Sequence, residues 1–172
     1  MTNQVSELSE NIAEIRWDSE TGKIADISFF RSDLRFKCGR CAVFCCKLGG
    51  PRMSREDIQR LSQAGCEPDD FQDATADGRF GLEGGEKPAM KQRENGSCVF
   101  LEYDGENKVY RCSVYEFRPA LCRLYPFEFK RTGLNTGLLR VIPCCNGLNT
   151  REGVSVGRKM IDELFGTILD LL

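Results

Sequence analysis

The chain of 172 residues is 41% hydrophobic and 29% charged, which is typical of a globular protein and unlike a disordered or membrane-spanning one. Its 24 basic and 26 acidic side chains leave a net charge of −2, so the overall charge gives no reason to expect nucleic acid or an anionic membrane as a partner. This length suits one hydrophobic core, and we predict a single domain over residues 1–172.

The N-terminal residues are not expected to be a secretory signal. Residues 1–17 are polar and acidic, and they lack the apolar segment of a secretory signal. The chain also lacks an apolar run of about 18 residues, the length that a membrane-spanning helix needs. We therefore expect a cytoplasmic protein that does not associate with a membrane.

The first predicted element is an amphipathic helix. Val5, Leu8, Ile12 and Ile15 recur at helical spacing, which predicts a helix over about 4–16.

Short strands and one well-bounded helix are expected next. Residues 23–30 and 33–38 are rich in β-branched and aromatic side chains, which favours extended structure. Ser54 as the N-cap and Gly65 as the stop bound a predicted helix. A short helix is expected around 69–76.

The second half of the chain predicts a hairpin that ends in two cysteines. Two strand-like runs flank a polar turn that contains Asp104, and Cys98 and Cys112 fall at the open end of this hairpin. Because cross-strand neighbours lie close together, the two thiols are expected to approach each other. Cys122 follows on a short helical turn, and a second hairpin or loop leads to residues 144–145.

An apolar stripe marks the last element. Met160, Ile161, Leu164 and Phe165 begin a series at i, i+3 and i+4 spacing, which predicts an amphipathic helix over about 152–171.

Ten cysteines and no histidine set this composition apart. Structural disulfides are rare in a reducing cytosol, so this many cysteines indicates metal or redox chemistry. Without histidine, a metal would be held by thiolates, completed where needed by carboxylate, inorganic sulfide or water. The composition excludes His-based catalytic zinc sites and His-based hydrolases.

The spacing of the four cysteines in residues 38–46 indicates a metal site but does not identify the metal. Cys38 and Cys41 form a C-x2-C pair, which suits a metal and, less well among so many thiols, a redox dithiol. Adjacent side chains of an extended segment point in opposite directions, so one of Cys45 and Cys46 can join this pair while the other faces a second site or the core. The spacing fits neither radical S-adenosylmethionine enzymes nor bacterial ferredoxins. Cys66 is interpreted as a buried apolar residue.

Five segments together resemble a known family. "CGRCAVFCC", "MSREDIQRL", "GSCVFLE", "CSVYEFRPALCRLYPF" and "CCNG" are similar to the cysteine-cluster family of zinc- or iron-chelating proteins with a C-x2-C-x3-C-C signature, over about residues 36–147. The resemblance implies eight metal ligands: Cys38, Cys41, Cys45, Cys46, Cys98, Cys112, Cys122 and Cys145. Cys145 is favoured over Cys144 because "CNG" resembles the "CPG" usual in the family.

The predicted fold is a small α+β domain in which short antiparallel strands, peripheral helices and long loops surround the metal. Only one C-x2-C pair is present and the other thiols come from distant segments, which favours an iron–sulfur cluster of the [4Fe–4S] type over zinc. Arg118 and Arg123 flank Cys122 and are expected to balance the charge of the thiolates without binding the metal.

Three functions remain open at this point. The first is an iron–sulfur protein that transfers electrons or helps to mature a partner protein. The second is a zinc-binding interaction module. The third is an enzyme related to protein lysine methylases, because some relatives in this family are flagellin lysine methylases. The chain, however, shows no recognisable nucleotide-binding segment. A protein partner is expected in each case, and nucleic acid is not.

Overall fold

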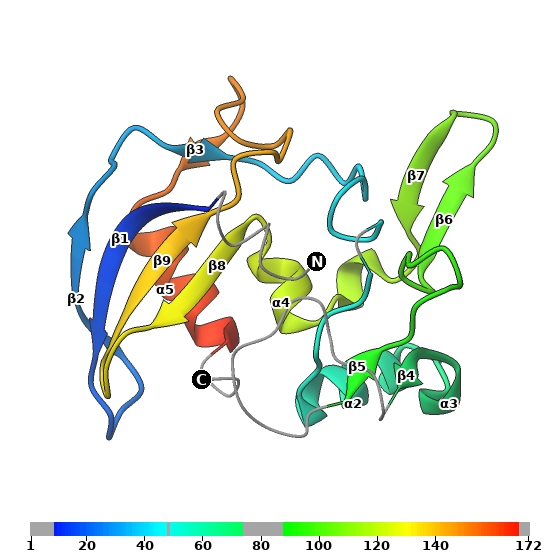
Figure 1. Ribbon diagram of the computed structural model, residues 1–172, viewed down its shortest axis with the longest axis horizontal. Helices are drawn as coiled ribbons and strands as arrows, with labels where there is room; N and C mark the ends of the chain where they lie inside the picture. Colours follow the sequence, from blue (N-terminus) through cyan, green and yellow to red (C-terminus); the bar gives the residue numbers. More distant parts are fainter. Residues whose placement is uncertain (1–8, 48, 74–87, 169–172) are drawn as a thin grey trace. The chain divides into compact units, whose positions relative to one another are not determined.

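The computed structural model describes residues 9–47, 49–73 and 88–168 (Figure 1). The chain divides into two compact units, and each is described by itself. Residues 1–39 and 124–172 form one, which we call the sheet unit. Residues 40–123 form the other, which we call the cysteine unit. The prediction of a single domain stays a prediction.

An antiparallel sheet of four strands, in the order β2-β1-β9-β8, is the centre of the sheet unit. The strands are β1 (Glu10–Trp17), β2 (Ile24–Phe29), β8 (Phe127–Arg131) and β9 (Thr136–Val141). β8 and β9 are the second hairpin that the sequence suggested.

β1 is a strand where the sequence predicted a helix. Ala13, Ile15 and Trp17 are buried and alternate with the exposed Glu14 and Arg16, as expected for a strand with one face on a core. Both edges of β1 are paired, one with β2 and the other with β9, so the sheet satisfies its backbone groups. The predicted helix is therefore wrong over residues 10–16, and residues 4–8 of that prediction lie outside the described part of the chain.

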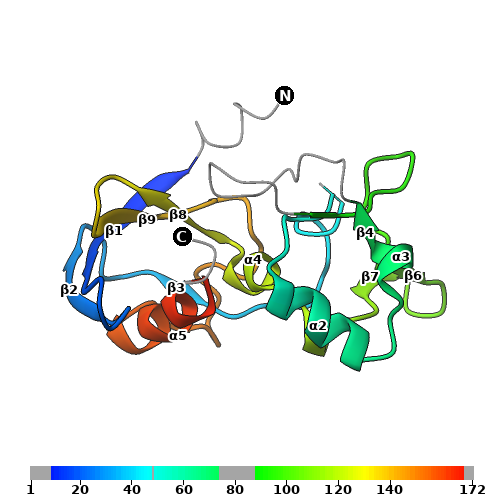
Figure 2. The same cartoon turned by 90° about the horizontal axis from the view of Figure 1, so that it is seen from below.

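The helix α5 (Arg158–Ile168) covers one face of this sheet (Figure 2). Its Phe165 ring lies 5.5 Å from the ring of Trp17 and 5.6 Å from that of Phe129, measured between centroids. The Arg158 guanidinium donates a hydrogen bond to the carbonyl oxygen of Ile24, at the start of β2. The helix is thus fixed to the sheet by aromatic packing and by a side-chain contact.

The predicted C-terminal helix begins later than expected. Residues Val154–Ser155 form strand β10, which pairs with β3 (Arg35–Phe36), so they are unavailable to a helix. The end of that prediction, residues 169–171, lies outside the described residues.

The cysteine unit consists of short elements joined by turns. Its helices are α2 (Arg55–Gln63), α3 (Pro68–Phe71), the 3-10 turn η1 (Tyr115–Phe117) and α4 (Ala120–Leu124), whose last residue belongs to the other unit. Its strands are β4 (Gln72–Asp73), β5 (Ala89–Met90), β6 (Leu101–Asp104) and β7 (Val109–Cys112).

Two predicted helices of this unit have different outcomes. Ser54 caps α2 through a reciprocal pair of hydrogen bonds with Asp57, as its sequence suggested. The helix expected around 69–76 is shorter, because the chain passes directly from α3 into β4 after Phe71. Residues 74–76 lie outside the described part.

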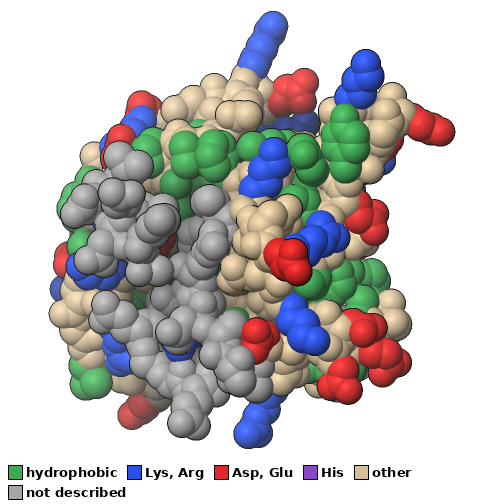
Figure 3. All heavy atoms as spheres, turned by 45° about the vertical axis from the view of Figure 1, so that its right-hand side comes forward, with side chains coloured by type: hydrophobic (Ala, Val, Ile, Leu, Met, Phe, Trp, Pro, Cys, Tyr) green, Lys and Arg blue, Asp and Glu red, His purple; other side chains and the backbone are tan. Residues whose placement is uncertain are grey.

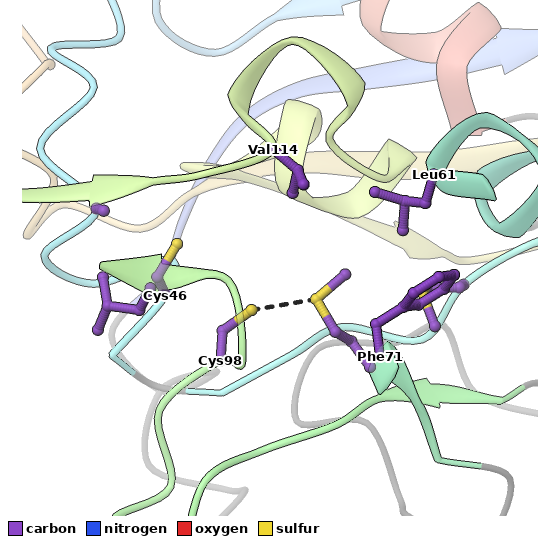
Figure 4. Packing of buried hydrophobic residues seen from close by; sticks show 9 residues of the cluster. Cys46, Leu61, Phe71, Cys98 and Val114 are labelled. Carbon is purple, nitrogen blue, oxygen red and sulfur yellow. Dashed lines mark hydrogen bonds between the residues drawn. The ribbon is translucent and has the colours of Figure 1, made fainter. Parts of the chain in front are cut away.

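The core of the cysteine unit contains thiols among ordinary apolar side chains (Figure 4). Cys46 and Cys98 are buried in it together with Leu61, Phe71 and Val114. Cys45, Cys66 and Cys112 are partly buried and pack against the same cluster. Sulfur atoms therefore form part of the hydrophobic packing of this unit.

These elements agree with the predicted fold class, a small α+β protein with short antiparallel strands. No helix in the described residues is both long and apolar enough to cross a membrane. On the face that Figure 3 presents, the described basic and acidic side chains are intermixed, in keeping with the near-neutral net charge.

Candidate metal centre

Five cysteines from four segments meet in the cysteine unit. Cys45 and Cys46 lie in the turn at 43–47, and Cys98 lies just before β6. Cys112 ends β7, and Cys122 lies in α4. We call these five residues the thiol cluster.

Backbone pairing brings the first three segments together. The Cys98 backbone nitrogen donates a 2.8 Å hydrogen bond to the carbonyl oxygen of Cys46. The β6–β7 hairpin pairs Leu101 with Cys112, which returns the chain to the neighbourhood of Cys98. This confirms the predicted hairpin and accounts for the electrostatic interaction between Cys98 and Cys112.

The thiols of the cluster interact directly. The sulfur atoms of Cys45 and Cys46 are 3.9 Å apart. Cys46 is also hydrogen-bonded to Cys112. Cys122 experiences the charges of Cys45, Cys98 and Cys112. Every member of the cluster thus interacts electrostatically or by a hydrogen bond with at least one other.

Two of these thiols already have the spacing of metal ligands. Two sulfur atoms bound to one ion at about 2.3 Å in tetrahedral geometry lie about 3.8 Å apart. The 3.9 Å between the sulfur atoms of Cys45 and Cys46 matches that sulfur–sulfur distance. The donor set therefore fits a thiophilic metal by its chemistry and, for this pair, by its spacing.

The full coordination sphere is not assembled. Within residues 9–47, 49–73 and 88–168, no group of three Cys, Asp or Glu side chains is arranged to hold a metal ion. As whole residues, Cys46 and Cys98 are buried, and Cys45, Cys112 and Cys122 are intermediate in exposure. Metal binding thus requires side-chain movement within a cluster whose backbone is already in place.

The protons are distributed unevenly over the cluster. The pKa of Cys112 is lowered to about 7, first because its sulfur accepts a hydrogen bond from Cys46, and further by hydrogen bonding to the backbone of Val114 and by the charge of Arg118. A second interaction with Cys46, in which Cys45 is the acceptor, lowers the pKa of Cys45. Cys46 shares its one proton between these two acceptors, so its own pKa is raised. A thiolate, the form that binds metal, is therefore accessible near neutral pH at Cys112.

Burial governs the two remaining thiols. Loss of solvent raises the pKa of Cys98 to about 11 and raises that of Cys122 well above its ordinary value. A cation that replaced these protons would remove the cost of burying a thiolate.

Arg118 lies close enough to act on this cluster electrostatically. Its charge favours the thiolate of Cys45, of Cys112 and of Cys122. The guanidinium stacks on the ring of Tyr115, 3.7 Å from the centroid, and its Nε donates to the Tyr115 carbonyl oxygen at 2.9 Å. These contacts hold the positive charge beside the sulfur atoms.

In the described part of the chain, the Arg123 guanidinium has fewer hydrogen-bond partners than that of Arg118. Its Nε is buried and has no hydrogen-bond partner among the described residues. Burial, and then the charges of Arg60 and Arg118, lower the pKa of this guanidinium, while the charges of Asp57 and, to a smaller extent, Cys122 raise it. A negative centre nearby would stabilise this arginine.

Asp57 is a structural residue of the site that sequence reasoning did not single out. Its buried carboxylate accepts hydrogen bonds from the backbone of Ser54 and from Arg60, and also from the backbone nitrogen of Ala120. Ala120 is the first residue of α4, which carries Cys122. The spacing of Ser54 and Asp57 could have revealed the cap, but not the contact with Ala120.

Three cysteines lie in the sheet unit. Cys38 follows β3, and its neighbour Lys37 donates a 3.0 Å backbone hydrogen bond to Gly147. A β-carbon at Gly147 would lie 2.4 Å from the Lys37 oxygen, so glycine permits this close approach. The pairing brings the backbone of Cys38 near that of Cys145, and Cys144 is exposed.

Two cysteines of the cysteine unit remain. Cys41 is exposed. Cys66 is partly exposed and packs against the apolar core, and burial followed by the charge of Asp70 raises its pKa. This agrees with the interpretation of Cys66 as an apolar residue.

The family model CxxCxxCC, described as "Putative zinc- or iron-chelating domain", matches residues 37–146, well over half of the chain. The matched region contains the whole thiol cluster as well as Cys38, Cys41, Cys144 and Cys145. No curated protein and no solved structure matches the chain at a significant level. The dense cysteines, their convergence and this match agree, and the chain belongs to the CxxCxxCC family.

Proposed function

We propose that the thiol cluster is a metal centre and that it holds an iron–sulfur cluster used in electron transfer or in the maturation of a partner protein. The observation that carries the proposal is the convergence of five thiols from four segments of the cysteine unit, with a Cys112 pKa of about 7. Each iron of a [4Fe–4S] cluster takes one thiolate, so ligands spread over several segments suit it.

Arg118 and Arg123 support a centre with net negative charge. Four thiolates around an iron–sulfur cluster leave an anion that must be balanced in a partly buried place. Arg118 already favours the thiolates, and the buried Nε of Arg123 has a donor to offer. We assign to both the role of lowering the energy of the charged centre without binding the metal.

A protein partner is part of the proposal, because electron transfer and maturation both need one. The β6–β7 hairpin exposes Tyr103 and Val109, and Phe117 is exposed in η1. Exposed aromatic side chains are common at protein interfaces.

Structural zinc is the second candidate, favoured by one specific observation. The 3.9 Å between the sulfur atoms of Cys45 and Cys46 fits two ligands on one tetrahedral ion. In an iron–sulfur cluster the same two thiols would have to move apart to reach different iron atoms.

The test is metal and sulfide analysis of anaerobically purified protein, with electron paramagnetic resonance after reduction. Iron and acid-labile sulfide in a fixed ratio, with a paramagnetic signal, are expected. Colourless protein with zinc and no iron would select the zinc module. The matched variants are Cys112→Ser, expected to lose metal, and Cys66→Ser, expected to keep it.

That further cysteines outside the thiol cluster bind the metal stays a prediction from the sequence. Cys38, Cys41 and Cys145 belong to the expected set, and their substitution by serine is measured in the same assay. Loss of metal in these variants would show that cysteines outside the thiol cluster also act as ligands.

A further inference from the structure

A methionine sulfur faces the thiol cluster. The Cys98 thiol donates a hydrogen bond to Sδ of Met90, with 3.1 Å between the two sulfur atoms (Figure 4). Met90 is 1% exposed and Cys98 is 4% exposed, so water does not compete for this contact. The cluster therefore has a neutral thioether donor in addition to its thiols.

The backbone holds both sulfur atoms in place. The Met90 backbone nitrogen donates to the Pro51 oxygen at 2.9 Å. Gly50 packs so tightly on Met90 that a β-carbon there would lie 2.4 Å from the Met90 Cβ. Cys98 is tied to the carbonyl of Cys46. The pair is thus fixed at the backbone, while the flexible methionine side chain can adjust its sulfur.

We propose that Met90 and Cys98 form a binding site for a soft monovalent d10 cation, of which Cu(I) is the biological example and Ag(I) the convenient probe. The cation takes the place of the proton that Cys98 now directs at Met90. Binding is written Cys98–SH + M⁺ → Cys98–S–M + H⁺, with Met90 Sδ as the second donor and no electron transferred.

Charge favours a monovalent cation at this pair. One thiolate and one thioether around M⁺ give a neutral unit, whereas a divalent ion on the same two donors would bury a net positive charge. Thiolate and thioether donors together also select Cu(I), while zinc sites are built from thiolate, imidazole and carboxylate.

Distance requires only a modest adjustment. Two sulfur atoms at about 2.3 Å from a shared ion lie about 3.8 Å apart at a tetrahedral angle and farther apart when the ion is two-coordinate. The 3.1 Å contact must therefore open, and the flexible methionine side chain is the part of the pair suited to move. Cys46, whose carbonyl oxygen accepts the backbone hydrogen bond of Cys98, is a candidate source of a third sulfur.

This inference goes beyond the proposed function, because it assigns a ligand and a class of cation that an iron or zinc centre does not require. It shares Cys98 with that centre, so the two metals are expected to compete. Iron or zinc binding is measured alongside to keep the two ideas separate.

The first experiment is anaerobic titration of the full chain with Cu(I) against a chromophoric chelator. Met90→Leu conserves volume and is expected to weaken Cu(I) binding by at least about tenfold, the lower end of what loss of a ligand-supporting group costs. Met53→Leu, another fully buried methionine of the same core, is the matched control and is expected to bind as the wild type does. Equal affinity in wild type and Met90→Leu overturns the proposal.

The second experiment detects the bond to methionine directly in the wild-type protein. Selenomethionine-labelled wild-type protein loaded with Cu(I) is expected to show a short selenium–copper vector at the selenium edge, lost in Met90→Leu. Absence of this vector in the loaded wild type overturns the proposal. Unchanged iron or zinc content in Met90→Leu, beside weakened Cu(I) binding, confirms that the two functions are separable. Failure to bind iron or zinc while Cu(I) binding depends on Met90 would remove the proposed function and leave this inference standing.

Discussion

Asp57 accepts a 2.9 Å hydrogen bond from the backbone nitrogen of Ala120, so the carboxylate that caps α2 also fixes the start of α4. The Arg60 guanidinium lies 3.0 Å from the same carboxylate oxygen. A buried charge with these partners is costly to remove, since asparagine would lose the charge that pairs with Arg60 and one of the two acceptor oxygens. The position of Cys122 in α4 depends on this residue.

Asp57→Asn is therefore expected to lower the free energy of unfolding by about 3 kcal/mol, the cost of breaking a buried ion pair. Chemical denaturation measures it. Glu67→Gln removes an exposed carboxylate of the same unit and serves as the control, with little change expected. Asp57→Asn protein with wild-type stability and wild-type metal content would contradict the positioning role.

Alkylation of the metal-free protein should follow the pKa of Cys112. The thiolate is the reactive form, so the rate at Cys112 rises as the pH increases through about 7, while Cys98 stays protonated until about 11. Mass spectrometry after timed iodoacetamide treatment resolves the two peptides. Equal rates for both cysteines at pH 8 would contradict this distribution of protons.

Arg118→Gln should move the Cys112 profile to higher pH, because the positive charge that favours the thiolate is lost. Arg111→Gln is the control. Arg111 adjoins Cys112 in sequence, but it is exposed and paired with Asp104 at 3.0 Å. The same alkylation assay applies, and a larger shift from Arg111→Gln than from Arg118→Gln would show that Arg118 is not the important charge.

Metal removal should loosen the cysteine unit first. Its strands are two to four residues long and its core contains the thiols themselves, whereas the sheet unit has a four-stranded sheet covered by α5. Hydrogen exchange with and without chelator under reducing conditions is expected to lose protection mainly in residues 49–73 and 88–123. Equal loss in β1 and β9 would argue against a core organised by metal.

Gly137→Ala should destabilise the sheet unit by about 1–3 kcal/mol, the usual cost of overpacking. A β-carbon at Gly137 would lie 2.2 Å from the Phe129 ring, which is itself packed against Trp17 and Phe165. Gly105→Ala has open space around the new atom and should be nearly neutral. Thermal unfolding compares the two variants.

Local signals in the sequence were sufficient where one segment determines its own structure. The capped helix α2 and the β6–β7 hairpin depend on neighbouring residues: Ser54 with Asp57, and the turn at Asp104. The predicted helix over 10–16 was wrong because Ile12 and Ile15 also fit helical spacing, and only pairing with β2 and β9 decides for a strand.

The sequence could predict that the candidate site consists of cysteines, but not which cysteines lie close together. Cysteine count and spacing indicated a metal, and the family resemblance implied eight ligands, of which five form the thiol cluster. Which thiols meet depends on contacts such as Cys98 to Cys46, which join residues far apart in sequence. The sulfur of Met90 gave no signal, because methionine is an ordinary core residue and only its direction makes it notable.

The backbone hydrogen bond between Cys98 and Cys46 also has a consequence for biosynthesis. Translation proceeds at about 5–20 residues per second, so Cys45 and Cys46 emerge from the ribosome seconds before Cys98 and Cys122. Until then the early cysteines lack the partners that give them a place in the fold. Oxidation of these cysteines during synthesis would therefore remove thiols before their partners in the fold exist.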